Sequence, residues 1–232
     1  MLSIIPTPLG NLEDITLRAL ETLKKIDWLA CEDTRRTLVL LRHFKIEKTL
    51  RSYHAHSSHH REDFILEALR QGQHIGLVSD AGTPGLSDPG VSLIQQALAE
   101  GIKVESLPGP CAAITALVGS GLPTDHFFFI GFLPRRPSRA ERLLRHAASL
   151  ESTIVVYESP YRVRKTLEQV IKIWGEACQV VIAREVTKFF EEWIRGTASQ
   201  VLTQLGEREL KGEVVILLKP STTDEEKPEN DD

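Results

Sequence analysis

The sequence predicts two α/β domains, an N-terminal one built on a parallel sheet and a C-terminal one built on a mixed sheet. The chain has 232 residues, 41% of them hydrophobic, which is enough to bury two modest cores. In the first half, short apolar runs alternate with amphipathic helical patterns. The segment GSGLPTD (119–125) breaks this alternation with two glycines and a proline. We therefore expect domains at 1–118 and 119–220.

In the first domain, five apolar runs are expected as strands and the segments between them as helices. Helical patterns cover DITLRALETLKKI (14–26) and REDFILEALRQG (61–72). A third helix, VSLIQQALAEG (91–101), is expected with Asp88 as its N-cap and Pro89 at the first helical position. Strand–helix alternation of this kind predicts a parallel sheet covered on both faces. The expected strands are Leu2–Ile5, Trp28–Cys31, Leu50–Tyr53, Ile75–Ser79 and Ile102–Leu107.

In the second domain, helices are expected at 138–149, 161–173 and 197–206. Only a few residues separate Ala183 from Glu191, too few for a helical crossover, so the strands that they bound should be antiparallel. The second sheet is therefore expected to be mixed. Its expected strands are His126–Leu133, Thr153–Tyr157, Gln179–Ala183, Glu191–Arg195 and Glu213–Leu218.

The net charge of −4 is unevenly distributed. The last twelve residues, STTDEEKPENDD, carry −5, which leaves residues 1–220 at +1. This stretch has no aromatic or aliphatic side chain to bury, so 221–232 is expected to be a disordered acidic tail. Because the rest is nearly neutral, contact with nucleic acid would need a local basic patch.

Other classes of protein are disfavoured by composition. The sequence has no run of 18 apolar residues and no basic segment before an apolar stretch at its start, so neither a membrane span nor a signal peptide is expected. The three cysteines are far apart and form no CxxC motif, which argues against a cysteine-built zinc site or a disulfide framework. A cytoplasmic protein fits this pattern best.

Three turns rich in glycine and proline follow expected strands: PTPLGN (6–11), DAGTPGLSDPG (80–90) and PGPCAAITAL (108–117). The carboxyl ends of parallel strands meet at one edge of a sheet, so these turns should converge there and form a ligand cleft, although each alone could be only a tight turn. The sequence has neither GxGxxG after the first strand nor GxxxxGK[ST], which disfavours a dinucleotide or a phosphate loop. Carbonyl-rich backbone and two aspartates favour a cationic or amine-bearing ligand.

Two charged clusters are candidates for substrate contact. ACEDTRRT ends the second expected strand, where a carboxylate could remove a proton while Arg35 and Arg36 hold phosphates. Alternatively, Asp33 or Thr34 caps a helix and both arginines are solvated. RRPSRAERLLRHA contains five arginines and one acid, which favours binding to an RNA backbone over a merely solvated helix face. These five are Arg135, Arg136, Arg139, Arg142 and Arg145.

Four histidines lie within YHAHSSHHR, from His54 to His60. Metal binding is disfavoured because the cluster contains no cysteine or carboxylate, although Glu62 and Asp63 follow it. Polar contact of His54 or His56 with a substrate is the preferred interpretation.

Taken together, several motifs resemble the family of ribosomal RNA small subunit methyltransferases I, which belongs to the tetrapyrrole-methylase-like class. The resemblance covers about residues 2–219. Its motifs are IPTPLGNLEDIT, ACEDTRRT, LVSDAGTPGLSDPG, LPGPCAAITALVGSGLPTDHFFFIGFLPRR, YESPYR and AREVTKFFEEWIRG. It implies a bacterial enzyme that methylates the ribose 2′-hydroxyl of a cytidine in the decoding centre of 16S rRNA within the 30S subunit, acting as a homodimer.

The resemblance also implies S-adenosylmethionine as the methyl donor, bound in a cleft between the two domains. From the residues themselves, no metal site is expected. The catalytic candidates are Asp33, Glu185 and Lys188, among which the sequence does not choose. The cofactor-binding candidates lie on the three turns: Pro8, Gly10, Asp80, Gly82, Thr83, Pro84, Gly85, Ser87, Pro108, Gly109, Pro110, Cys111, Ala112 and Ala113. Two other functions stay open: a methyltransferase of this fold acting on a tetrapyrrole or a protein side chain, and a non-catalytic RNA-binding protein.

Overall fold

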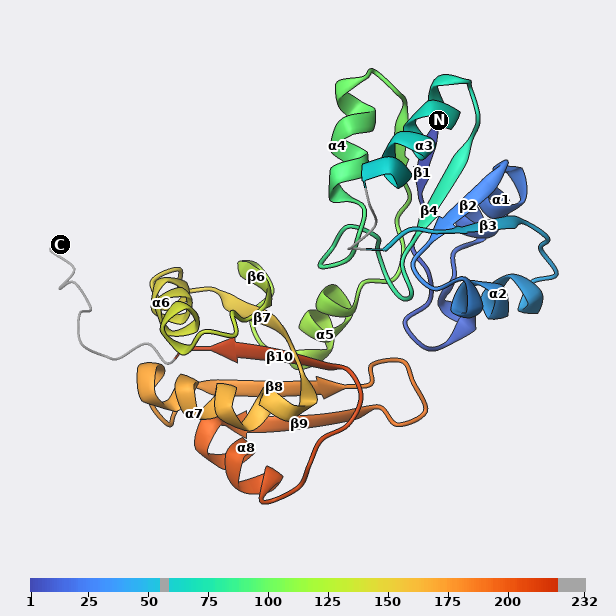
Figure 1. Ribbon diagram of the computed structural model, residues 1–232. Coiled ribbons are helices and arrows are strands. Elements are labelled where there is room, and N and C mark those ends of the chain that lie inside the picture. The colour runs from blue at the N-terminus through green and yellow to red at the C-terminus, as the bar shows by residue number, and fades with distance from the viewer. Residues whose placement is uncertain (55–58, 221–232) are drawn as a thin grey trace, which may run out of the picture. The chain divides into compact units, whose positions relative to one another are not determined.

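The computed structural model describes residues 1–54 and 59–220 (Figure 1). The acidic segment for which disorder is expected lies outside these residues. The chain divides into two compact units, Met1–Ala112 and the part that begins at Ala113. This division falls six residues before the expected boundary after residue 118. Among the described residues, no helix is both long enough and apolar enough to cross a bilayer.

The first unit is built on a five-stranded parallel sheet with the strand order β3-β2-β4-β1-β5. The expected parallel sheet is confirmed, and the ends of its strands lie within two residues of the expected ends. The strands are β1 (Leu2–Ile4), β2 (Trp28–Cys31), β3 (Thr49–Ser52), β4 (Ile75–Val78) and β5 (Val104–Ser106). The order places β4 and β1 at the centre and leaves β3 at an edge.

Helices cover both faces of this sheet, as expected. On one face, Leu66 of α3 (His59–Arg70) and Leu93 of α4 (Val91–Ala99) are buried in one core cluster. On the other face, Leu23 of α1 (Leu17–Lys25) and Leu41 of α2 (Thr34–His43) are buried in a second cluster. Two-sided burial explains why the three inner strands, β1, β2 and β4, are buried at every position, whereas the outer strands β3 and β5 are partly exposed.

Two helix starts differ from the sequence expectation. The first pattern divides into a short 3-10 turn, η1 (Leu12–Asp14), and α1, because the Thr16 side chain accepts the Ala19 N–H at 3.1 Å and starts α1 there. The prediction that Asp88 caps the third helix with Pro89 at its first position is wrong. Gly90 occupies the N-cap of α4 with φ +131°, and no side chain caps that helix. The left-handed turn at Gly90, which only glycine adopts freely, redirects the chain after Pro89.

The second unit is built on a mixed sheet with the order β6-β7-β10-β8-β9. β6 (Phe127–Phe132) and β7 (Thr153–Glu158) are parallel, whereas β8 (Gln179–Arg184) and β9 (Glu192–Thr197) form the expected antiparallel pair. β10 (Val214–Lys219) is antiparallel to both of its neighbours, β7 and β8. The mixed sheet is therefore confirmed.

Three helices of the second unit pack into one core on a single face of its sheet. These are α6 (Pro137–Ala148), α7 (Val163–Trp174) and α8 (Ala198–Leu205), and they contribute Leu144, Leu167 and Val201 to that core. A 3-10 turn, η2 (Pro160–Arg162), precedes α7, and α5 (Ala112–Ser120) begins the unit. α5 contacts the other face of the sheet, where the Ala113 N–H donates to the Tyr157 hydroxyl at 3.2 Å and a Cβ on Gly119 would lie 2.6 Å from the Trp193 ring.

Candidate functional site

The three glycine- and proline-rich turns of the first unit are joined by hydrogen bonds. Thr7 and Gly82 form an antiparallel bridge, each N–H donating to the other's carbonyl oxygen at 2.9 Å. The Thr83 hydroxyl donates to the Pro110 carbonyl oxygen at 2.9 Å. The predicted convergence of these turns at one edge of the parallel sheet is therefore confirmed.

The glycines of the central turn allow a backbone path that other residues resist. Gly82, Gly85 and Gly90 have φ of +78°, +83° and +131°, and Ser87, at +64°, is one of the few residues with a side chain in this region. A Cβ on Gly82 would lie 3.2 Å from the Leu9 Cδ2 atom. The turn is thus specified by backbone conformation and by the close approach of its neighbour.

Position 109 requires glycine for a different reason, which is close packing against another turn. A Cβ there would lie 2.5 Å from the Pro6 Cβ, a separation that packed atoms do not tolerate. The first and third turns therefore touch through this glycine, and any side chain would force them apart. The structure thus gives Gly109 a packing role between two turns, and its contact with a ligand stays a prediction.

A cluster of carboxylates borders the turns. The Asp33 N–H donates to Asp80 Oδ1 at 2.9 Å, and Arg36 Nη1 lies 3.5 Å from Asp80 Oδ2. The pKa of Glu32 is raised, chiefly because the group is partly buried and also because the negative charge of Asp80 is near. The segment ACEDTRRT therefore meets the central turn, as expected from their common sheet edge.

A small cavity of about 90 Å³ lies between the first turn, the end of β4 and α2. Its lining includes Pro8, Gly10, Arg36 and Asp80. Ligand pockets typically enclose about 300–1,000 Å³, so this cavity would hold only part of a cofactor.

The fourteen predicted cofactor-binding residues lie on these three turns, and no observation tests whether they contact a cofactor. Pro8, Gly82, Pro84 and Ala113 are buried, whereas Gly10, Ser87, Pro108 and Gly109 are exposed. The remaining six are partly exposed: Asp80, Thr83, Gly85, Pro110, Cys111 and Ala112. Thr7, absent from the prediction, is buried and ties the first turn to the central one, and its Oγ1 donates to the Ser79 carbonyl oxygen. Its position directly after an apolar run was the available signal.

Asp33 is the N-cap of α2, as the alternative interpretation expected. Its carboxylate accepts the Arg35 N–H at 2.8 Å and forms an ion pair with the Arg35 guanidinium at 2.8 Å. These contacts lower the pKa of Asp33 to about 2. A carboxylate of such low pKa is a weak proton acceptor at neutral pH. Its predicted catalytic role has no direct test here.

Glu185 and Lys188 form an ion-pair network in the connection between β8 and β9. Lys188 Nζ lies 3.0 Å from Glu185 Oε1 and 3.0 Å from Glu213 Oε2. Burial opposes the charge of Lys188, but the two carboxylates outweigh burial and raise its pKa. Burial likewise opposes the charge of Glu185, and the Glu213 N–H and the ammonium outweigh it and lower its pKa. Both groups stay charged near neutrality, and their place in catalysis stays a prediction.

The five predicted RNA-binding arginines of the second unit lie on or just before α6, and all are exposed. The buried side of α6 is formed by Ala140, Leu144 and Ala147. Arg145 pairs with Glu141 at 2.8 Å. No ion pair with a described residue occurs for Arg135, Arg136, Arg139 and Arg142. This helix therefore presents uncompensated positive charge to solvent.

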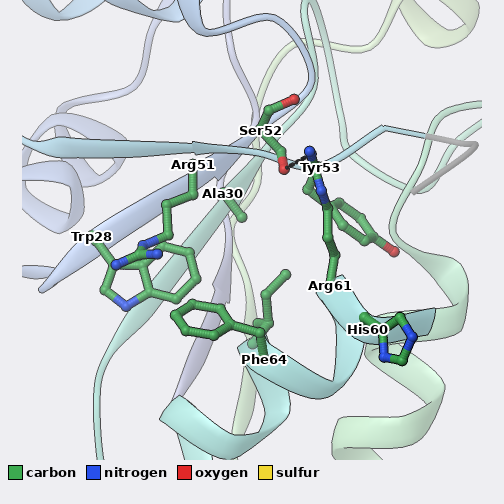
Figure 2. Close-up of a pocket in the computed structure, with 9 residues that line it drawn as sticks. Trp28, Ala30, Arg51, Ser52, Tyr53, His60, Arg61 and Phe64 are labelled. Carbon is green, nitrogen blue, oxygen red and sulfur yellow. Dashed lines mark hydrogen bonds between the residues drawn. The ribbon is translucent and has the colours of Figure 1, made fainter. Parts of the chain in front are cut away.

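A second cavity of the first unit, of about 380 Å³, opens beside the edge strand β3 (Figure 2). The Arg51 guanidinium lies over the rings of Trp28 and Phe64, at 5.3 and 4.6 Å from their centroids. Arg61 Nη1 donates to the Ser52 carbonyl oxygen at 2.7 Å. Residues 55–58, which join β3 to α3, lie outside the described residues, so we assign this cavity no ligand.

The described residues contain no group of three or more His, Cys, Asp or Glu side chains that could hold a metal ion. The metal interpretation of the histidine cluster is not tested by this finding, because His56 lies outside the described residues and the side chain of His59 is not described. His54 and His60 are exposed.

Fold and sequence together define the class of protein. A family model described as Tetrapyrrole (Corrin/Porphyrin) Methylases matches residues 1–202, and the chain belongs to this family. The methyltransferase CobJ shares the fold with a TM-score of 0.72 and 19% identity, over 95% of this chain and 94% of that one. Uroporphyrin-III C-methyl transferase from Thermus thermophilus, solved in complex with S-adenosyl homocysteine, has a TM-score of 0.68 and 16% identity, over 94% and 96%.

Within this class the chain groups with the proteins named ribosomal RNA small subunit methyltransferase I. The relative from Hydrogenobaculum sp. (strain Y04AAS1) is 48% identical over 225 residues, which are 96% of this chain and 96% of that protein. The relative from Halalkalibacterium halodurans is 44% identical over 218 residues, 94% of this chain and 75% of that protein. The resemblance seen in the sequence motifs is confirmed.

Proposed function

We propose that the protein is an S-adenosylmethionine-dependent methyltransferase that methylates the ribose 2′-hydroxyl of a cytidine in the decoding centre of 16S rRNA. The observation that carries this proposal is identity of 44–48% over nearly the whole chain to proteins named for methylating small-subunit rRNA. The 30S subunit as substrate, a homodimer and a cytoplasmic location belong to the same proposal.

The turns of the first unit fit the proposed donor. They bring backbone groups and small residues together, held by the Thr7–Gly82 bridge and by the Thr83–Pro110 hydrogen bond. Glu32, Asp33 and Asp80 add negative charge beside the turns. S-adenosylmethionine supplies a methyl group on a positively charged sulfur, and it also carries an amine. The local excess of carboxylates suits both positive charges. The donor would be held by three groups of residues: Pro8 and Gly10 of the first turn, Asp80 and Gly82–Ser87 of the central turn, and Pro108–Ala113 of the third turn.

Glu32 is the group that we assign to removal of the 2′-hydroxyl proton. A ribose hydroxyl is a poor nucleophile, so its attack is assisted by a base within hydrogen-bond reach. Partial burial and the neighbouring Asp80 raise the pKa of Glu32, which makes its carboxylate a better proton acceptor than an ordinary glutamate. Asp33 is less suited, because Arg35 holds its pKa at about 2.

The exposed arginines on and before α6 would hold the phosphates of the rRNA. Positive side chains that lack an acidic partner are the groups that displace counterions from a nucleic-acid backbone. Arg35 and Arg36 are also exposed on α2 and could contact phosphates, but each is paired with an aspartate, Asp33 or Asp80, so they would add less to RNA binding.

The proposal is tested by incubating the purified protein with a methyl-labelled donor and, separately, 30S subunits, naked 16S rRNA and a tetrapyrrole. Nuclease digestion and mass spectrometry then identify the methylated nucleoside. Label recovered as 2′-O-methylcytidine from one rRNA position is the expected result. Transfer to the tetrapyrrole without transfer to either RNA would instead support the small-molecule alternative.

A further inference from the structure

The second unit gathers four exposed aromatic side chains at one edge of its sheet. Phe132 pairs in register with Tyr157, and Val214 lies between Glu158 and Arg184, which itself pairs with Glu192. β6, β7 and β8 therefore end, and β9 and β10 begin, along the same edge. Figure 1 shows the β8–β9 connection leaving the sheet where β8 ends and β10 begins.

We call the aromatic side chains at this end of the sheet the aromatic edge: Phe132, Tyr161, Phe189 and Phe190. Their exposed fractions are 59%, 82%, 94% and 66%. Three strand spacings of about 4.8 Å separate β6 from β8, so the aromatic edge extends over roughly 15 Å. Single exposed apolar side chains need no explanation, whereas a gathering of this kind marks a binding surface.

The hairpin that carries two of these rings is fixed by its own polar contacts. The Thr187 N–H donates to Glu191 Oε2 at 2.6 Å, and the other oxygen of Glu191 accepts from Trp193 Nε1 at 2.8 Å. The ion pairs of Lys188 with Glu185 and Glu213 brace its base. The Phe189 and Phe190 rings meet edge to face, 5.0 Å apart. The rings are thus presented to solvent on a defined backbone.

A second brace holds the connections that carry Phe132 and Tyr161. Arg162 Nη2 donates to the carbonyl oxygens of Leu133 and Pro134 at 3.1 and 3.3 Å, and Arg162 Nε lies 3.3 Å from Glu158 Oε1. Glu158 is itself buried and accepts the hydroxyl hydrogen of Thr166 at 2.8 Å. One arginine therefore ties the loop after β6 to the turn after β7.

The charge along these connections is positive. Residues 133–136, 159–162 and 185–191 contain four basic and two acidic side chains. Because Arg162 and Lys188 are also paired with Glu158 and Glu213, the free positive charge is that of Arg135 and Arg136. The two acids, Glu185 and Glu191, are engaged within the hairpin, whereas Arg135 and Arg136 are exposed and pair with no described acid. Rings beside free arginines are the combination that binds single-stranded nucleic acid, since bases stack on the rings and the cations hold the phosphates.

We propose that the aromatic edge, with Arg135 and Arg136, binds unstacked bases in a single-stranded segment of the RNA substrate. The inference rests on the proposed function, because it takes RNA as the substrate. It adds a contact that reads exposed bases rather than backbone charge. Such a contact explains how the enzyme would select a nucleotide in a single-stranded region over one in a duplex.

The experiment measures binding of a fluorescein-labelled, twelve-nucleotide single-stranded oligoribonucleotide by fluorescence anisotropy, without a methyl donor and over a range of salt concentrations. The test variant is Phe189→Ala/Phe190→Ala. Its Kd should rise at least tenfold, because stacking on these rings is lost. The slope of log Kd against log salt should keep its wild-type value, because no phosphate contact is removed. A duplex of the same sequence should show no such loss.

Two matched controls and an oligomeric measurement complete the test. Phe189→Tyr/Phe190→Tyr keeps both rings and should bind as the wild type does. Phe127→Ala removes a partly exposed ring at the opposite end of β6 and should also leave binding unchanged. The inference is overturned if the wild type does not bind the single strand, if the double alanine variant binds normally, or if that variant converts a dimer into a monomer in sedimentation.

The same proteins are assayed for methyl transfer to 30S subunits, which separates the two proposals. If the wild type methylates 30S subunits and the double alanine variant binds the single strand normally, the proposed role of the aromatic edge is overturned and the proposed function stands. If the double alanine variant loses single-strand binding and the wild type transfers no methyl group to any rRNA, RNA binding by the aromatic edge is supported and the proposed reaction is overturned.

Discussion

Thr7 and Gly82 exchange two main-chain hydrogen bonds of 2.9 Å, which join the turn after β1 to the turn after β4. This bridge forms between two loops, outside the sheet. It fixes the distance between the two turns that we propose to bind the methyl donor. The φ of Gly82, +78°, is part of the arrangement.

Gly82→Ala should therefore weaken both the fold and donor binding. A side chain in the left-handed region costs about 1–2 kcal/mol, and the new Cβ would press on Leu9. We expect the free energy of unfolding to fall by about that amount and the donor Kd to rise at least tenfold, as measured by denaturant unfolding and calorimetry. Gly72→Ala is the matched control, because Gly72 has φ +86° and open space around it. If both variants bind the donor equally well, the central turn does not hold it.

Asp33→Asn should change acid stability but not turnover. Asparagine caps helices as well as aspartate does, so α2 should persist. The folded-state pKa of Asp33, about 2, lies below its ordinary value of 3.8. The contribution of Asp33 to stability is therefore present above pH 3.8 and is lost as the pH falls toward 2. Between pH 4 and pH 2 the variant should lose less stability than the wild type in thermal unfolding. A hundredfold drop in kcat at pH 7, with donor affinity intact, would restore Asp33 as the base.

Glu32→Gln should remove the proton acceptor while keeping the size of the side chain. We expect kcat to fall at least tenfold, with little change in donor Kd. In the wild type, kcat should rise with pH through the raised pKa of Glu32, and this rise should be absent from the variant. The measurement is single-turnover methyl transfer to 30S subunits between pH 5 and pH 9. An unchanged pH profile would exclude Glu32.

Arg139→Gln/Arg142→Gln/Arg145→Gln should weaken RNA binding and spare donor binding. Each lost phosphate contact should lower the magnitude of the slope of log affinity against log salt by roughly 0.7–0.9. Arg139 and Arg142 should account for most of the change, because Arg145 is already paired with Glu141. Turnover at saturating 30S subunits should be nearly intact.

The control for this variant removes three exposed basic side chains of the first unit, in Lys25→Gln/Arg42→Gln/Lys103→Gln. Wild-type salt dependence in the α6 variant, or equal losses in both variants, would show that α6 presents only a solvated face.

The architecture was predictable because it depends on periodicity and spacing. Alternating apolar and amphipathic segments require a parallel sheet, and a parallel sheet brings its turns to one edge, so contacts such as Thr83 with Pro110 followed from the topology. The start of α4 was not predictable in this way. Asp88-Pro89 has the composition of a helix start, but the helix begins only after Gly90, whose φ is +131°. The amino-acid types alone do not determine such a backbone angle.

The chemistry of individual residues was less predictable, because it depends on neighbours far away in the sequence. Gly109 is small because Pro6 lies against it. Lys188 is held as an ammonium by Glu213 as well as by Glu185. The raised pKa of Glu32 depends on Asp80, which belongs to another strand end. None of these pairs is adjacent along the chain, so sequence alone could name the candidates but not their ionisation.

The position of β10 has a consequence for synthesis of the protein. In the first sheet, the last strand made is β5, at an edge, whereas in the second it is β10, between β7 and β8. A chain emerging from the ribosome can therefore complete its first sheet early, but β7 and β8 lack their shared partner until Val214–Lys219 emerge. In stalled nascent chains of increasing length, protease resistance should appear first in the N-terminal unit. The C-terminal unit should become resistant to protease in one step, only when β10 has emerged from the ribosome. Protease resistance of this unit at shorter chain lengths would contradict this order.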